Sequence, residues 1–113
     1  MEIIDKNINL EELKQMAEKM FGNLIKAVVD IKKGIMAVNG ELHADEEALL
    51  LQNGSKQENL WGINIYPDLK GDDFIEFDSM INLRPSQGNR SRGVDSEEIR
   101  NKIIGIVNKL ITK

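Results

Sequence analysis

Apolar residues recur at helical spacing soon after the start of the chain. Between residues 10 and 21 they fall three or four positions apart, which forms one apolar stripe on a helix. Asn9 precedes this stripe and Glu12 follows three residues later, which is the arrangement of a helix-capping box. Gly22 stands where a left-handed residue ends a helix. The pattern therefore predicts a helix over residues 10–21.

Two further segments have helical patterns. Asp45 is placed to cap a helix over residues 46–53, and the acidic residues at 45–47 favour the positive end of a helix. Near the C-terminus, Asp95 or Ser96 is placed to cap a helix that runs to about residue 111. Its apolar positions form a single stripe, as expected for a helix lying on a core.

Other segments are short and rich in β-branched residues, or alternate between apolar and polar residues, which predicts strands. Asn39-Gly40 is a strong hairpin signal, so Glu41–His43 either begins another strand or is released toward the next helix. The predicted strands are residues 1–5 at a sheet edge, 24–31, 35–38, 60–66 and 74–84.

The strands over 60–66 and 74–84 are expected to pair as a hairpin. If Tyr66 lies opposite Phe74, then Asn64 lies opposite Glu76, and Gly62 leaves room opposite Asp78. One face of this hairpin is then polar. Antiparallel sheets often have one solvated face, so these charges have either a functional role or only contact with water. The polar face is completed by Asn82 and Arg84.

The order of helices and strands predicts an α+β fold, with a mainly antiparallel sheet and about three helices packed on one face. The length of 113 residues indicates a single domain over 1–113.

Composition limits the classes of function. The net charge is −4, so neither extended nucleic acid nor an anionic membrane is an expected partner. Cysteine is absent, which excludes disulfides and thiolate metal sites and fits the cytoplasm. The first residues lack the apolar run of a signal peptide, and no stretch is long and apolar enough to span a membrane. No motif for a nucleotide-binding loop or catalytic triad is present, and the sequence identifies no cofactor.

Three of the four arginines lie in the ten-residue stretch RPSQGNRSRG at 84–93, and no acidic residue falls between Asp78 and Asp95. Arginine matches phosphate or carboxylate in a two-point geometry, and glycine allows backbone N–H groups to approach a ligand. This pattern predicts an anion site. The alternative is a structural clamp, in which the arginines bind the protein's own carboxylates. The predicted ligand-binding residues are Arg84, Ser86, Gln87, Asn89, Arg90, Ser91 and Arg92, with Asn64 and Asn82.

The only histidine, His43, lies in the acidic stretch GELHADEE. A single histidine without cysteine provides too few of the usual ligands for a transition-metal site, so we expect no metal. His43 and the carboxylates of Glu76 and Asp78 are weak candidates for acid–base catalysis. The alternative is that His43 only stabilises the start of the nearby helix.

Four phrases, GELHADEEALLL, LWGINIYP, FIEFDSMINLRPSQGNRSRGV and IRNKIIGIVNKL, resemble a family of small uncharacterised bacterial and archaeal proteins known only as a domain of unknown function. The resemblance covers nearly the whole chain and implies no activity.

Three functions follow, in order of preference. The first is a small binding protein with a site for a phosphate-type anion at residues 84–93. The second is a homo-oligomeric interaction protein that pairs with a second copy through the polar face or through the apolar edge near Met1–Ile4. The third is a hydrolase or transferase that uses Glu76, Asp78 and His43.

Overall fold

The computed structural model describes all residues from 1 to 113, and its centre is an antiparallel sheet of five strands. The chain crosses the sheet out of sequence order, so the first strand lies at one edge beside the fourth. From one edge to the other the strands are β1 (Glu2–Ile4), β4 (Ile35–Val38), β3 (Ile25–Asp30), β5 (Leu60–Ile65) and β6 (Ile75–Glu76). A second, two-stranded parallel sheet joins β2 (Ile8–Asn9) to β7 (Ile111–Thr112).

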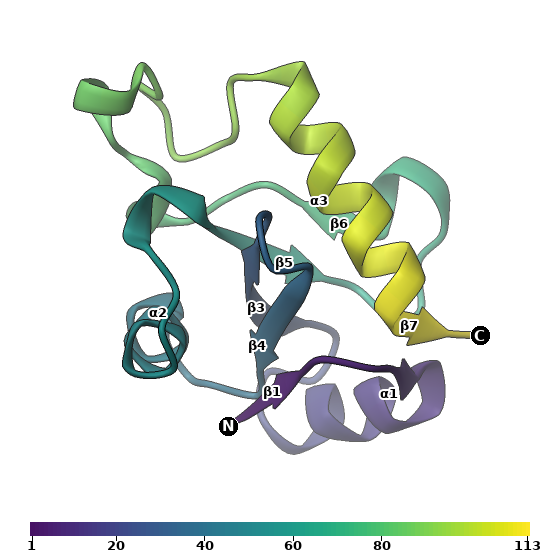
Figure 1. Cartoon of the computed structure of the whole chain (residues 1–113). Helices are drawn as coiled ribbons and strands as arrows, with labels where there is room; N and C mark the ends of the chain where they lie inside the picture. Colours follow the sequence, from purple (N-terminus) through teal and green to yellow (C-terminus); the bar gives the residue numbers. More distant parts are fainter.

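Helices cover both faces of the five-stranded sheet (Figure 1). The larger core lies between the sheet and the helices α1 (Leu10–Lys19) and α3 (Glu97–Leu110). The smaller core lies on the opposite face, under α2 (His43–Gln52). The predicted α+β class with an antiparallel sheet is confirmed, but the placement of all three helices on one face is wrong. In β3 the consecutive residues Ala27, Val28 and Val29 are all fully buried, so both faces of this strand need cover.

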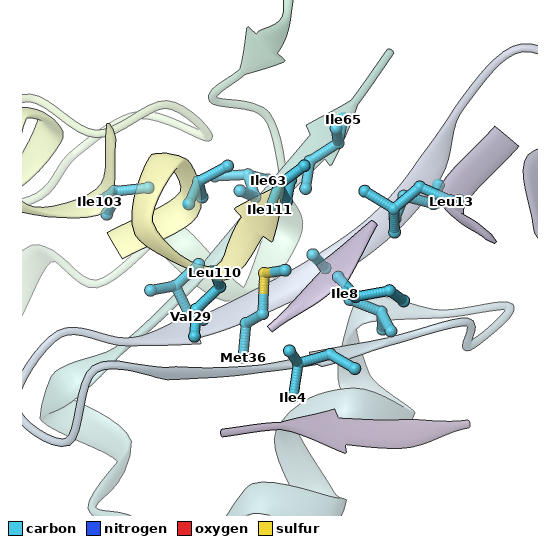
Figure 2. Close-up of a cluster of buried hydrophobic side chains, with 14 of the residues drawn as sticks. Ile4, Ile8, Leu13, Val29, Met36, Ile63, Ile65, Ile103, Leu110 and Ile111 are labelled. Atoms are coloured by element: carbon cyan, nitrogen blue, oxygen red, sulfur yellow. The ribbon is translucent and has the colours of Figure 1, made fainter. Parts of the chain in front are cut away.

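Figure 2 shows the larger core, in which side chains from helices and strands meet. Met36 of β4 lies among branched side chains of β1, β2, β3 and α3. A flexible, unbranched methionine fills an irregular gap between branched neighbours. The parallel pair β2–β7 brings the two ends of the chain together beside this core, since Ile8 pairs with Ile111.

The helix ends follow the sequence closely in two places and depart from it in one. Asn9 accepts a hydrogen bond from the Glu12 N–H at 2.8 Å, and Ser96 caps α3. Helix α2 begins at His43, two residues before the predicted cap at Asp45. The alternative strand over residues 41–43 is therefore wrong, and Asn39-Gly40 releases the chain into the helix.

The longest predicted strand, over 74–84, is paired only at Ile75–Glu76. The predicted register is confirmed in this part, because Asn64 pairs with Glu76 and the Tyr66 N–H donates to the Phe74 carbonyl. Gly62 does not lie opposite Asp78 as predicted. After β6 the chain turns away and forms short 3-10 turns, at Met80–Asn82 (η3) and Pro85–Gln87 (η4), as it does earlier at Gln57–Asn59 (η1) and Gly71–Asp73 (η2).

No helix is both long enough and apolar enough to cross a membrane.

Gly62 is required by close packing, which gives a first prediction. A Cβ at this position would lie 2.6 Å from both Cβ and Oγ of Ser79, so we expect Gly62→Ala to lower the free energy of unfolding by about 1–3 kcal/mol. Gly105 provides the matched control, because a Cβ there meets nothing within 4 Å. Gly105→Ala lies in a helix and should raise stability by about 0.5–1 kcal/mol. Urea unfolding of both variants measures this, and equal effects would contradict the packing around Ser79.

Candidate functional site

Arg84, the first residue of the arginine-rich loop 84–93, is buried under the loop. Its guanidinium donates to three backbone carbonyls, those of Ile81 at 3.0 Å, Gln57 at 2.8 Å and Leu60. The group also lies over the Trp61 ring, 4.4 Å from the ring centre. Burial lowers the pKa of Arg84, although the carboxylate of Glu47 acts in the opposite direction. Arg84 therefore ties the loop to β5 and to the turn before it.

The side-chain amide of Asn82 continues the sheet where β6 ends. Its Oδ1 accepts the Gly62 N–H at 2.8 Å, and its Nδ2 donates to the Gly62 carbonyl at 2.9 Å. The carboxamide thus takes the place of a partner strand for one residue of β5. Nδ2 also donates to the Arg92 carbonyl at 3.0 Å, which fixes the far end of the loop.

Asn89 closes the loop from inside. Its Nδ2 lies 2.7 Å from the Asn82 carbonyl, 3.1 Å from that of Ser91 and 2.9 Å from that of Gly93. Its Oδ1 accepts the Asp95 N–H at 2.8 Å. Asn82 and Asn89 are both buried and were predicted as ligand-binding residues, but their amide groups hydrogen-bond to the protein backbone.

Asp95 accepts hydrogen bonds from other donor groups of the loop. Its carboxylate accepts from Ser91 Oγ at 2.5 Å and from the Arg90 N–H at 2.8 Å, and these bonds lower the pKa of Asp95. Gln87 binds the Glu58 carbonyl and Arg84, whereas Ser86 is exposed and makes no side-chain hydrogen bond. Most of the loop is thus held by internal contacts.

Two arginine side chains of the loop reach solvent. Arg90 is exposed, and its guanidinium makes neither a hydrogen bond nor an ion pair. Arg92 binds Asp78 through Nε, 2.9 Å from the carboxylate, with both side chains about half exposed. The predicted anion site stays a prediction, and only these two guanidinium groups remain accessible for it.

A polar row crosses three strands on the face that carries α2. Lys26 of β3 pairs with Asn64 of β5, which in turn pairs with Glu76 of β6. Asn64 Nδ2 donates to Glu76 Oε1 at 2.8 Å, and the Tyr66 hydroxyl donates to the same oxygen at 3.0 Å. Burial and the bond to Glu76 raise the pKa of Tyr66. Because Asn64 turns its nitrogen to the carboxylate, its Oδ1 is left buried without a partner.

His43 stands beside this row, at the first residue of α2. Its Nε2 lies 2.7 Å from the Ile63 carbonyl, which can only accept, so Nε2 carries the proton. Burial lowers the pKa of His43, and the ring is neutral at pH 7. Nδ1 then presents a lone pair and has no partner in the structure. The charges of Lys26, Asp78 and Arg92 also act on this pKa.

These residues form one polar cluster, drawn from five separate parts of the chain. Sequence analysis identified most of them but missed Lys26, although the alternation of β3 places it on this face. No hydrogen bond joins His43 to Glu76 or Asp78 in this structure, and a catalytic role for these three residues stays a prediction. No group of three or more His, Cys, Asp or Glu side chains is arranged to hold a metal ion. The polar cluster consists of Lys26, His43, Asn64, Tyr66, Glu76, Asp78 and Arg92.

Glu46, which was expected to act as a charge at the helix start, is fully buried under α2. Its Oε2 accepts the Gly40 N–H at 3.0 Å, and its Oε1 has no partner. Burial raises the pKa of Glu46 to about 9, so the carboxyl group is protonated at neutral pH. A Cβ at Gly40 would lie 2.7 Å from Cγ of Glu46, which explains the glycine there. No periodicity in the sequence distinguishes this acid from its exposed neighbours.

Comparison with known proteins identifies the family and no function. A family model described as a protein of unknown function, DUF5674, matches residues 2–110, and the chain belongs to this family. No curated protein and no solved structure matches the chain.

The contacts of the loop predict unequal roles for two of its arginines. Arg84→Ala leaves three carbonyls without their donor and should lower the free energy of unfolding by roughly 3 kcal/mol or more. Arg90→Ala removes an exposed side chain and should change it by less than about 0.5 kcal/mol. Chemical denaturation of both variants tests this, and a mild effect of Arg84→Ala would contradict the role of Arg84 in holding the loop to β5.

Glu46 predicts a dependence of stability on pH. In the unfolded chain its carboxyl ionises near pH 4.5, whereas the folded protein holds the proton up to about pH 9. Between these values the unfolded state binds fewer protons, so stability falls as the pH rises. Glu46→Gln keeps an acceptor for the Gly40 N–H and should remove this part of the slope. Urea unfolding between pH 5 and pH 9 measures the slope, and the exposed Glu41→Gln variant should retain it. An unchanged slope in Glu46→Gln would contradict the buried proton.

Proposed function

We propose that the chain is a small-molecule binding protein, and that its polar cluster takes a neutral polyhydroxylated ligand of the sugar or polyol class. One observation carries the proposal. The polar cluster contains two cations, Lys26 and Arg92, two carboxylates, Glu76 and Asp78, and a neutral histidine, so its formal charges balance. A charge-balanced surface favours a neutral ligand over a strongly charged one.

The hydrogen-bonding groups that remain free in the cluster include both donors and acceptors. Acceptors are Asn64 Oδ1, His43 Nδ1 and the second oxygens of both carboxylates, while Arg92 keeps its terminal N–H groups as donors. A hydroxyl group donates one hydrogen bond and accepts others, so neighbouring hydroxyls match such a mixture. Inorganic phosphate mainly offers acceptors and would also face two carboxylates.

Asn64 favours a ligand-binding role for the cluster over the alternative that its charged side chains only contact water. Its side chain is about nine-tenths buried, and a buried polar atom without a partner destabilises a fold by roughly 1–3 kcal/mol. A ligand hydroxyl that reaches Oδ1 after a small side-chain shift recovers this energy. The cluster lies at the protein surface, with Asp78 and Arg92 about half exposed, so we expect dissociation constants near the millimolar range, about −4 kcal/mol.

A second candidate is the phosphate-type anion site. It is favoured by the exposed, unpaired guanidinium of Arg90, two residues from Arg92. An acid–base role for His43 with Glu76 or Asp78 and homo-oligomer formation at a sheet edge both stay predictions. Light scattering tests the latter.

The histidine makes the main proposal measurable by NMR, because His43 is the only histidine in the chain. Titration with glucose, ribose or sorbitol should shift the imidazole signals of His43 and the side-chain amide of Asn64. Asn64→Ala should abolish the response of His43. Asn7→Ala serves as the matched control, because Asn7 is exposed and makes no side-chain hydrogen bond.

Parallel titrations with inorganic phosphate and glucose 6-phosphate separate the two candidates. A response to phosphate that is lost in the double variant Arg90→Gln, Arg92→Gln, with no response to the neutral compounds, would establish the anion site and reject the polyol site. A response of His43 to neutral sugars that persists in Asn64→Ala would also reject the proposed site.

A further inference from the structure

A separate groove lies on the other face of the sheet and is lined by residues of α3 and of the segment that contains β6. Figure 1 shows where these two segments lie. Its volume is about 590 Å³, which is within the range of small-molecule sites. Phe74, Ile75 and Phe77 line one side, and Ile104 of α3 is the apolar residue on the other. None of the residues of the polar cluster lines this groove, so it would hold a different ligand.

Arg100 is the least exposed of the charged residues that line the groove. It is half-buried, and its Nη1 donates to the Val94 carbonyl at 2.6 Å and to the Asp95 carbonyl at 3.1 Å. These two bonds restrict the position of the side chain. Nε and Nη2 make no hydrogen bond, and no carboxylate lies within ion-pair distance of the group. The carboxylate of Asp95 feels the charge of Arg100, which helps to lower the pKa of Asp95, but no carboxylate pairs with the guanidinium directly, so its free N–H groups remain open to an anionic partner.

The acidic residues of the groove do not supply that partner. Glu97 precedes Arg100 by three positions on α3, and Asp72 lies in η2, but both side chains are exposed. A second cation lies in the groove instead, since the Lys113 ammonium is 4.6 Å from the centre of the Phe74 ring. The groove thus combines flat apolar side chains with the half-buried charge of Arg100, while the charges of Lys113, Asp72 and Glu97 are exposed.

We propose that this groove binds a small aromatic carboxylate. The carboxylate would accept hydrogen bonds from the free Nε and Nη2 of Arg100 in a two-point contact. The ring would lie against Phe74, Phe77 and Ile104, because aromatic and aliphatic side chains favour a flat apolar body. The guanidinium is already held by two backbone carbonyls, so little of its freedom is lost on binding.

The test uses benzoate and 2-naphthoate, with the neutral amides benzamide and 2-naphthamide as isosteric controls. In ¹H–¹⁵N spectra of the full chain, the carboxylates should shift backbone signals at residues 74–77 and 97–108. They should bind about tenfold more tightly than the amides, since a charge-assisted pair is lost in the latter. Arg100→Gln should remove this difference. Ile104→Asp, at a partly exposed position, should abolish binding by placing a like charge beside the ligand.

Lys6→Gln is the matched control, because it removes an exposed cation outside the groove and should leave carboxylate binding unchanged. Should Arg100→Gln fail to fold, the comparison of acid with amide and the Ile104→Asp variant decide alone. Benzoate is added up to about 10 mM, which detects binding down to roughly millimolar affinity. If no signals shift at residues 74–77 and 97–108, the proposal is overturned. Equal affinity for acid and amide would overturn it as well. Neither result bears on the polyol proposal, whose reporters are His43 and Asn64.

Discussion

The need to pair buried backbone groups determines the structure of the second half of the chain. Strand β5 is buried along its whole length, yet its neighbour β6 accompanies it for only two residues. The remaining exposed edge of β5 is completed by side chains, with the Asn82 carboxamide on Gly62 and the Arg84 guanidinium on Leu60. These side chains provide the hydrogen bonds that a neighbouring strand would otherwise provide. The backbone of residues 77–93 can therefore follow an irregular path.

That irregular path positions the polar cluster. With a regular strand continuing from β6, the polar residues would have been spread along a flat ladder. The turn at Ser79 instead brings Asp78 under Arg92, since the Ser79 N–H donates to the Arg92 carbonyl. Asn82 binds the same carbonyl, so one backbone group of the loop is held twice. The arginine-rich loop therefore contributes to the cluster mainly through Arg92, while most of its other polar side chains hold the loop together.

Sequence periodicity predicted the parts of the fold that depend on local patterns. The stripe of α1 and its cap at Asn9, the alternation of β5, and the pairing of Asn64 with Glu76 all follow from positions near one another in the chain. Apolar and polar residues continue to alternate in the sequence after Glu76, which predicted a longer strand. In the structure, the side chains of Asn82 and Arg84 instead form hydrogen bonds with the backbone of β5. Such long-range hydrogen bonds leave no periodic trace.

The candidate site was predictable to a similar degree. Residues such as His43, Glu76 and Asp78 were recognised from their chemistry, but their convergence required the placement of α2 on the face opposite α1 and α3. The buried proton on Glu46 was not recognisable, because an acid in the first turn of a helix is normally a favourable surface charge. Glu46 differs from an ordinary surface acid only because it lies on the side of α2 that packs against the sheet.

In the segment after the η2 turn, neighbouring side chains point to opposite sides of the backbone, and the two sides have different surroundings. Phe77 and Ile75 face the groove beside α3, whereas Glu76 and Asp78 face the polar cluster beneath α2. One short piece of backbone is thus a shared wall between two compartments. Any molecule that immobilises this wall from one side alters the entropy that a molecule on the other side must lose, and the resulting linkage is reciprocal.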